Sequence, residues 1–183
     1  FLTPDRFKRL NEHGSKILTD YFNQNKNNWQ NIIYQELGVY NHEKEGVNLS
    51  GKIDRIDNSE NGLVVYDYKT SKYDYQKKKL FQSPSAENLV GGEYWRQLVF
   101  YKLLMDLRNS KEVPIAGSII FLEREKGDVE FKEEKIHFTT NDTEKLFEII
   151  LTYVNKLKNY EIESCGECAW CEFTGKIKNT LFD

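Results

Sequence analysis

The stretch that decides the fold is residues 51–70, GKIDRIDNSENGLVVYDYKT. Two segments with β-branched and other apolar residues, 47–57 and 63–69, flank a polar run that ends in Asn61-Gly62. Asn-Gly between two such segments is typical of a tight hairpin, because these residues tolerate a positive φ. The sequence therefore predicts two antiparallel strands joined at residues 58–62.

Two acidic side chains are expected to meet on this hairpin. Residues two apart in a strand share a face, so Asp67 and Lys69 should point the same way. Counting back from the turn places Asp54 roughly opposite Asp67, at the ~5 Å spacing of cross-strand neighbours. Two carboxylates that close repel each other unless a cation lies between them, and Mg²⁺ prefers such oxygen ligands. Asp-x-Lys alone would fit a surface ion pair equally well, and Asp54 is what makes the pattern informative.

Outside the hairpin, periodicity predicts the remaining elements. Apolar residues at helical spacing predict helices at 3–25, 93–107 and 141–157, and apolar or alternating runs predict strands at 29–40, 114–122 and 128–138. The segment 71–92 lacks periodicity, so we expect a functional or mobile loop there. The order α-β-β-β-α-β-β-α predicts an α/β (α+β) fold, a mixed sheet flanked by helices.

Length and composition restrict the class of protein. The 183 residues suffice for one domain spanning 1–183, and the net charge of −3 does not by itself indicate a nucleic-acid binder. No apolar run approaches the ~20 residues of a membrane span, and no signal-peptide pattern is visible, so we expect a cytoplasmic protein without membrane contact. Because the chain begins with Phe1 rather than Met, we expect a C-terminal fragment of a larger protein.

A lysine-rich stretch follows the hairpin. These residues either form a solvated loop or contact DNA phosphates, and their position directly after Lys69 makes the two readings about equal. They are Lys72, Lys77, Lys78 and Lys79.

The hairpin segments Gly51–Asp57 and Val64–Thr70, with Gln97-Leu98-Val99-Phe100-Tyr101 in the following helix, resemble the RecB-type nuclease branch of the PD-(D/E)xK superfamily. The resemblance covers about Thr3 to Tyr160. It implies a restriction-endonuclease-like α-β-β-β-α-β core and metal-dependent hydrolysis of DNA. It further implies the exonuclease module of a RecB-like repair or recombination protein, with a helicase domain or subunit as partner.

The resemblance also assigns roles to hairpin residues. Asp54 and Asp67 match the metal-binding carboxylates, the backbone carbonyl of Tyr68 would complete the shell around Mg²⁺ or Mn²⁺, and Lys69 matches the catalytic lysine. A catalytically silent module that binds DNA or a helicase partner is the alternative. Because such modules typically lose the acids or the lysine, the intact Asp54, Asp67 and Lys69 favour the enzyme.

Four further residues are candidates for the site. Gln97 and Tyr101 match the downstream helix motif and, four residues apart, share a helix face, although Tyr101 could equally be core. Glu36 would be either an accessory acid near the metal or simply exposed. Relatives often supply a metal-binding His from an N-terminal helix. Either His13 substitutes for it, or the ligand lies outside this chain, which we favour.

Three cysteines lie in the C-terminal segment 161–183, namely Cys165, Cys168 and Cys171. Some relatives bind an iron–sulfur cluster through four cysteines, but this chain has no fourth one. A zinc site would likewise need another ligand. We therefore expect an incomplete iron–sulfur or zinc site, which only a longer protein could close, or reduced thiols.

Overall fold

The computed structural model describes residues 3–108, 111–125, 127–161, 166, 168, 169, 171 and 172. The chain divides into two compact units, Phe1–Glu148 and Ile149–Asp183. The first unit contains the whole sheet and every residue of the predicted hairpin. Among the described residues, no helix is long and apolar enough to cross a membrane.

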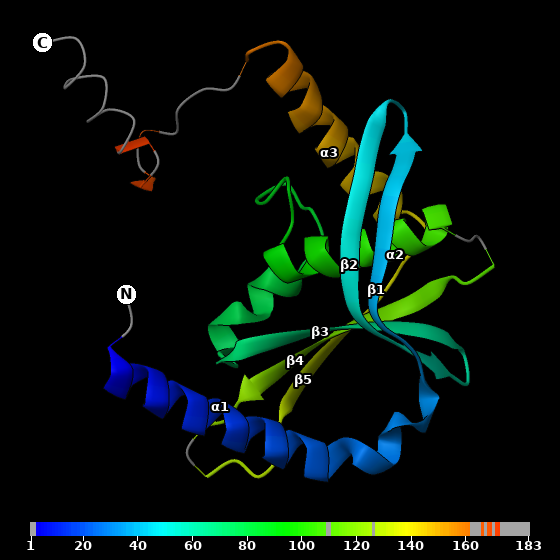
Figure 1. Ribbon diagram of the computed structural model, residues 1–183. Helices are drawn as coiled ribbons and strands as arrows, with labels where there is room; N and C mark the ends of the chain where they lie inside the picture. The colour runs from blue at the N-terminus through cyan, green and yellow to red at the C-terminus, as the bar shows by residue number, and fades with distance from the viewer. Residues whose placement is uncertain are drawn as a thin grey trace, which may run out of the picture. The chain divides into compact units, whose positions relative to one another are not determined.

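The observed elements follow the predicted order (Figure 1). The helices are α1 (Pro4–Asn25), α2 (Glu93–Arg108) and α3 (Asp142–Lys158), with short 3-10 helices η1 (Lys26–Asn31) and η2 (Tyr75–Phe81). The strands are β1 (Ile32–Lys44), β2 (Val47–Ser59), β3 (Gly62–Lys72), β4 (Pro114–Glu123) and β5 (Lys132–His137). They form one sheet in the order β1-β2-β3-β4-β5, in which only β3 and β4 run parallel. The predicted mixed sheet with flanking helices is confirmed.

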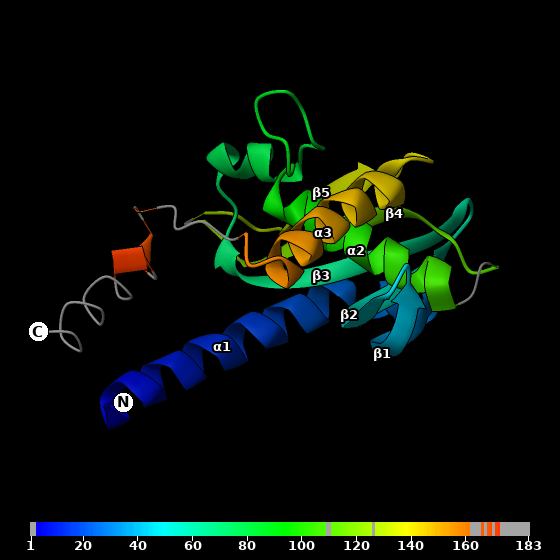
Figure 2. The same cartoon turned by 90° about the horizontal axis from the view of Figure 1, so that it is seen from above.

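Both faces of the sheet are covered near β4, which explains the continuous apolar run of that strand. Ile119 and Phe121 pack in one cluster with Leu98 of α2. The alternate residues Ile120 and Leu122 pack in another cluster with Tyr21 of α1. The helices α1 and α2 therefore cover opposite faces of the sheet (Figure 2).

Several element boundaries differ from the prediction. The apolar residue Trp29 lies in η1 rather than in a strand, and its ring packs 5.3 Å from that of Phe22. The segment 71–92, expected to be a loop, contains the end of β3 and η2. The last strand begins at Lys132 instead of 128. The start of β5 coincides with the pairing of Lys132 to Phe121 of β4, a contact that local periodicity does not record.

The hairpin joins β2 to β3 as expected, with Ser59 paired to Gly62, whose φ is +137°. The pairing is shorter than predicted, because the ladder begins only at the Arg55–Tyr66 pair. Before that point β2 pairs with β1 alone, and the two strands rise out of the sheet as an arm (Figure 1). Asp54 and Asp67 therefore lie one position outside the ladder, where β2 separates from β3.

Candidate active site

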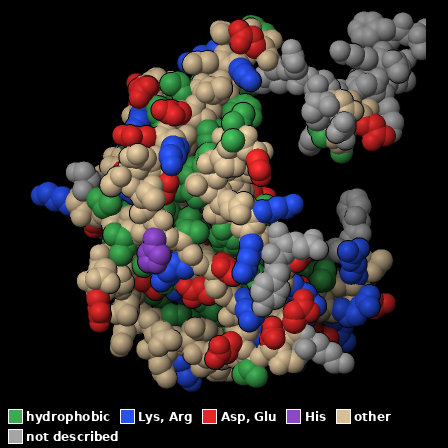
Figure 3. Space-filling model, turned by 180° about the vertical axis from the view of Figure 1, so that it is seen from behind, with side chains coloured by type: hydrophobic (Ala, Val, Ile, Leu, Met, Phe, Trp, Pro, Cys, Tyr) green, Lys and Arg blue, Asp and Glu red, His purple; other side chains and the backbone are tan. Residues whose placement is uncertain are grey.

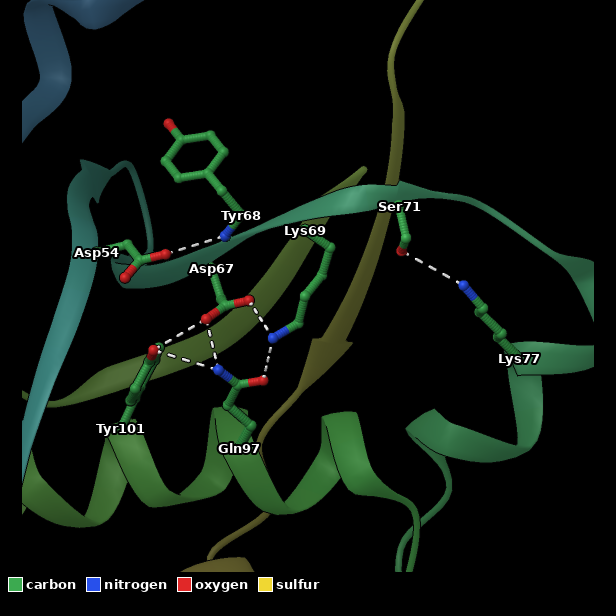
Figure 4. Close-up of polar contacts among 8 residues, drawn as sticks. All are labelled: Asp54, Asp67, Tyr68, Lys69, Ser71, Lys77, Gln97 and Tyr101. Atoms are coloured by element: carbon green, nitrogen blue, oxygen red, sulfur yellow. Dashed lines mark hydrogen bonds and ion pairs between the residues drawn. The ribbon is translucent and has the colours of Figure 1, made fainter. Parts of the chain in front are cut away.

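Asp67 is the most buried acid of the predicted site, with 4% of its surface exposed. Its Oδ1 accepts hydrogen bonds from Gln97 Nε2 and, at 2.9 Å, from the Tyr101 hydroxyl. Its Oδ2 lies 2.8 Å from Lys69 Nζ. The contacts join β3 to α2, because Asp67 and Lys69 share a strand face and Gln97 and Tyr101 share a helix face (Figure 4).

The amide of Gln97 links the two charged residues. Its Oε1 accepts a hydrogen bond from Lys69 Nζ at 2.7 Å, while its Nε2 donates to Asp67. Burial raises the pKa of the Tyr101 phenol, and the negative charge of Asp67 raises it further. Tyr101 therefore stays protonated at neutral pH and donates to the carboxylate.

Asp54 approaches the same strand from β2. Its Oδ2 accepts a hydrogen bond from the backbone N–H of Tyr68 at 3.1 Å. Burial raises the pKa of Asp54, the bond from Tyr68 counteracts it, and the negative charges of Asp67 and Glu36 raise it again. Two carboxyl groups, those of Asp54 and Asp67, thus lie near the single ammonium of Lys69.

The residues present fit a divalent cation. Asp67 Oδ2 is buried and makes no well-directed hydrogen bond, although it lies within ion-pair distance of Lys69. The carbonyl and N–H of a strand residue point toward the same neighbour, so the Tyr68 carbonyl faces the edge where Asp54 binds. Within the part of the chain that the structure describes, no three His, Cys, Asp or Glu residues gather closely enough to hold a metal. An ion would thus rely on two carboxylates, one carbonyl and water.

The two accessory candidates, Glu36 and His13, differ in their position relative to the acids of the hairpin. Glu36 has a positive φ of 52°, forms an ion pair with Lys52 and lines the same groove as Asp54, so it remains a candidate accessory acid. His13 Nε2 lies 3.0 Å from Glu123 Oε1 at the end of β4, and its side chain is exposed. The structure thus brings Glu36, but not His13, toward the acids of the hairpin.

The predicted DNA-binding lysines differ in their surroundings. Lys72 forms an ion pair with Glu125 at 3.3 Å, and Lys77 donates to the backbone carbonyl of Lys72 at 2.9 Å. Lys78 and Lys79 are exposed. A groove of about 690 Å³ is lined by Lys72, Tyr73, Asp74, Lys77, Glu123, Glu125, Asp128 and Lys132. On the face drawn in Figure 3 acidic and basic side chains are likewise mixed.

The cysteine segment is described only in part. The Sγ atoms of Cys168 and Cys171 lie 3.5 Å apart. Cys165 lies outside the described residues, so the expected incomplete metal site remains a prediction.

Arg55 and Asp57 form a salt bridge, with Arg55 Nε 2.9 Å from Asp57 Oδ1. Sequence reasoning missed that Arg55 also donates to the Tyr68 hydroxyl at 2.6 Å, and that Tyr21 of α1 joins this buried group. Tyr21 lies in the predicted helix 3–25 and Arg55 in the predicted strand 47–57, so no local pattern indicated that the two residues meet.

Comparisons with known proteins identify the family of this chain and proteins of similar fold. The model of the PD-(D/E)XK nuclease superfamily matches residues 4–175. A search of curated proteins finds no significant match. A provisionally assigned exonuclease from Eubacterium rectale has a similar fold, with a TM-score of 0.53 and 17% sequence identity over 92% of this chain and 60% of that one. The protein SSO0001 matches with a TM-score of 0.43 and 14% identity, over 88% of this chain and 66% of that one. The chain spans less than two thirds of the length of both proteins.

Proposed function

Because this chain belongs to the PD-(D/E)XK nuclease superfamily, we propose that it hydrolyses the phosphodiester bonds of DNA with the help of Mg²⁺ or Mn²⁺. One observation carries the proposal. The buried carboxylate of Asp67 is held by Lys69, Gln97 and Tyr101, and Asp54 is anchored on the next residue of the same strand. An exposed Asp–Lys ion pair forms without burial of the acid and without further side-chain partners. Asp67 is buried and has three such partners, which a surface ion pair does not explain.

The metal ligands in this proposal are Asp54, Asp67 and the backbone carbonyl of Tyr68. A divalent ion held by these residues would lower the pKa of the attacking water and neutralise charge on the phosphate. Lys69 is a donor only, so it cannot bind the cation. Its ammonium instead stabilises the negative charge that develops on the phosphate during attack.

Gln97 and Tyr101 position these groups. Both donate to one oxygen of Asp67, and Gln97 also accepts from Lys69. These bonds fix the carboxylate and the ammonium relative to each other before substrate binds, which lowers the reorganisation needed in the transition state. The provisionally assigned exonuclease with a similar fold supports exonuclease activity. We propose that the chain is the nuclease module of a RecB-like cytoplasmic repair protein with a helicase partner.

A second candidate function is a catalytically weak module that binds DNA or a helicase partner. Two observations favour it. Only two carboxylates converge among the described residues, and His13 pairs with Glu123 instead of joining them. A site with few charged ligands binds Mg²⁺ weakly, and its activity would need millimolar metal or a ligand from the larger protein.

Cleavage of linear and circular DNA in Mn²⁺ tests the proposal. We expect the linear DNA to shorten, EDTA to stop the reaction, and Asp54→Asn to remove activity. Glu43→Gln is the matched control, because it removes the same charge from an exposed position on the β1–β2 arm. Cutting that continues in EDTA would exclude the metal mechanism, and cutting of circular DNA would exclude a pure exonuclease. A parent protein that binds DNA without cutting it would favour the weak module.

A further inference from the structure

A groove of about 680 Å³ opens beside Asp54, between α1, η1 and the first strands of the sheet. Most of its surface is apolar or aromatic, and the acids Asp54 and Glu36 also line it. The apolar lining is formed by Leu18, Phe22, Trp29, Ile32, Tyr68 and Leu122. The groove thus joins an apolar surface directly to a proposed metal ligand.

Tyr21 is the buried side chain of α1 beside the groove, and Ile17 of the same helix is partly buried against its cluster. Tyr21 is 8% exposed and packs edge-on against Tyr68, with ring centroids 5.6 Å apart. The neighbouring Leu18 and Phe22 remain 60% and 48% exposed at the groove. Large apolar side chains that stay exposed beside an acidic site indicate a binding surface more than a folding core.

Buried polar contacts of Arg55 hold the residues at the rear of the groove. Arg55 is 9% exposed, donates to the Tyr68 hydroxyl at 2.6 Å and pairs with Asp57. Tyr68 therefore has its hydroxyl held by Arg55, while its backbone N–H holds Asp54. Anything that packs against the ring of Tyr68 is placed at a fixed position relative to Asp54.

We propose that this groove binds an unpaired nucleobase of the DNA strand whose phosphate lies at Asp54. The inference rests on the proposed nuclease function and names its substrate class. Flat aromatic surfaces bind bases by stacking, independently of sequence, and a cavity of this size accommodates one nucleotide unit. The face of a paired base is covered by its neighbours in the duplex, so only an unpaired base can enter. The preferred substrate is then single-stranded DNA or a frayed end.

The test is a binding titration of the intact chain with fluorescein-labelled dT20 at low salt in EDTA, where metal-dependent cleavage cannot interfere. Phe22→Ala should weaken binding about tenfold, the effect of losing one base–aromatic stack, and Leu18→Ala should weaken it less. Phe7→Ala and Leu10→Ala are matched controls on the same helix. Their side chains are 61% and 51% exposed but do not line the groove. Both controls should bind dT20 like the parent.

A strand of 20 abasic nucleotides keeps the sugar-phosphate backbone of dT20 but lacks its bases. Comparing the two strands therefore separates contacts to bases from contacts to phosphates. Phe22→Ala should not change the affinity for this strand, because it removes no charge. Equal losses on dT20 and on the abasic strand would overturn the proposal, as would a Phe22→Ala variant that binds dT20 as tightly as Phe7→Ala does. Unchanged dT20 affinity combined with loss of self-association in Phe22→Ala would assign the groove to a second copy of the chain and overturn it too.

The two proposals can fail separately. A base-dependent loss of affinity in a protein that never cuts DNA would keep the nucleobase site and reject the nuclease. Metal-dependent cutting in which Phe22→Ala behaves like the parent on every strand would keep the nuclease and reject the nucleobase site. Circular dichroism and the melting temperature of each variant show whether a lost affinity reflects unfolding. The exposed Leu18 supplies a second variant in case Phe22→Ala unfolds.

Discussion

Replacing Lys69 by Met tests whether this lysine contributes to the rate of cleavage without contributing to metal affinity. The change keeps the length of the side chain but removes an ammonium that lies 2.8 Å from Asp67 Oδ2 and 2.7 Å from Gln97 Oε1. Breaking a fully buried ion pair costs about 3–5 kcal/mol. Here the lysine side chain is 25% exposed, and Asp67 keeps its bonds from Gln97 and Tyr101. We therefore expect the free energy of unfolding without metal to fall by about 1–3 kcal/mol.

The same variant should lose activity without losing metal. The rate of cleavage should fall on the order of 10² to 10³-fold, the usual effect of losing one transition-state contact. Calorimetric titration should show Mn²⁺ binding at least as tightly as in the parent, because a positive charge beside Asp67 has been removed. Mn²⁺ should then raise the melting temperature of Lys69→Met more than that of the parent, since the cation replaces the missing charge.

Lys72→Met is the matched control from the same strand. Its ion pair with Glu125 spans 3.3 Å between side chains that are 49% and 60% exposed, and such pairs contribute about 0–1 kcal/mol. The reasoning is refuted if Lys69→Met cuts DNA at the parental rate, or if it destabilises the protein no more than Lys72→Met does. In the first case Lys69 would be an ion-pair partner without a catalytic role, and in the second its ion pair with Asp67 would contribute no more stability than the exposed pair of Lys72.

Three further predictions concern neighbouring parts of the site. The pKa of Asp54 is raised in the folded protein, so the stability it contributes is present at acidic pH and is lost as pH rises through the folded pKa. Asp54→Asn should accordingly raise the metal-free melting temperature at pH 7 but not at pH 3. Tyr68→Phe removes the hydroxyl that accepts the 2.6 Å hydrogen bond from the buried Arg55 and should cost about 1–3 kcal/mol in urea unfolding, whereas an unchanged midpoint would contradict that bond. DNA should protect residues 77–79 from trypsin if the segment 71–92 closes on substrate, and equal digestion with and without DNA would argue against closure.

The sequence by itself determined which residues share a face on each element. Strand alternation places Asp67 and Lys69 together, helical spacing places Gln97 and Tyr101 together, and Asn61-Gly62 marks the turn that brings Asp54 toward β3. These are short-range consequences of backbone geometry, which is why they could be predicted. The order of elements could be predicted for the same reason.

Only the tertiary structure decided how these faces meet. The separation of β2 from β3 at Arg55 turns Asp54 toward the backbone of Tyr68 instead of leaving it in the ladder. Acids beyond residue 120 neutralise part of the lysine-rich stretch, and α1 leaves Phe22 beside the acidic site instead of in the core. Each of these three features depends on contacts between segments far apart in the chain. The local periodicity of the sequence does not show how such segments pack or how their charges compensate.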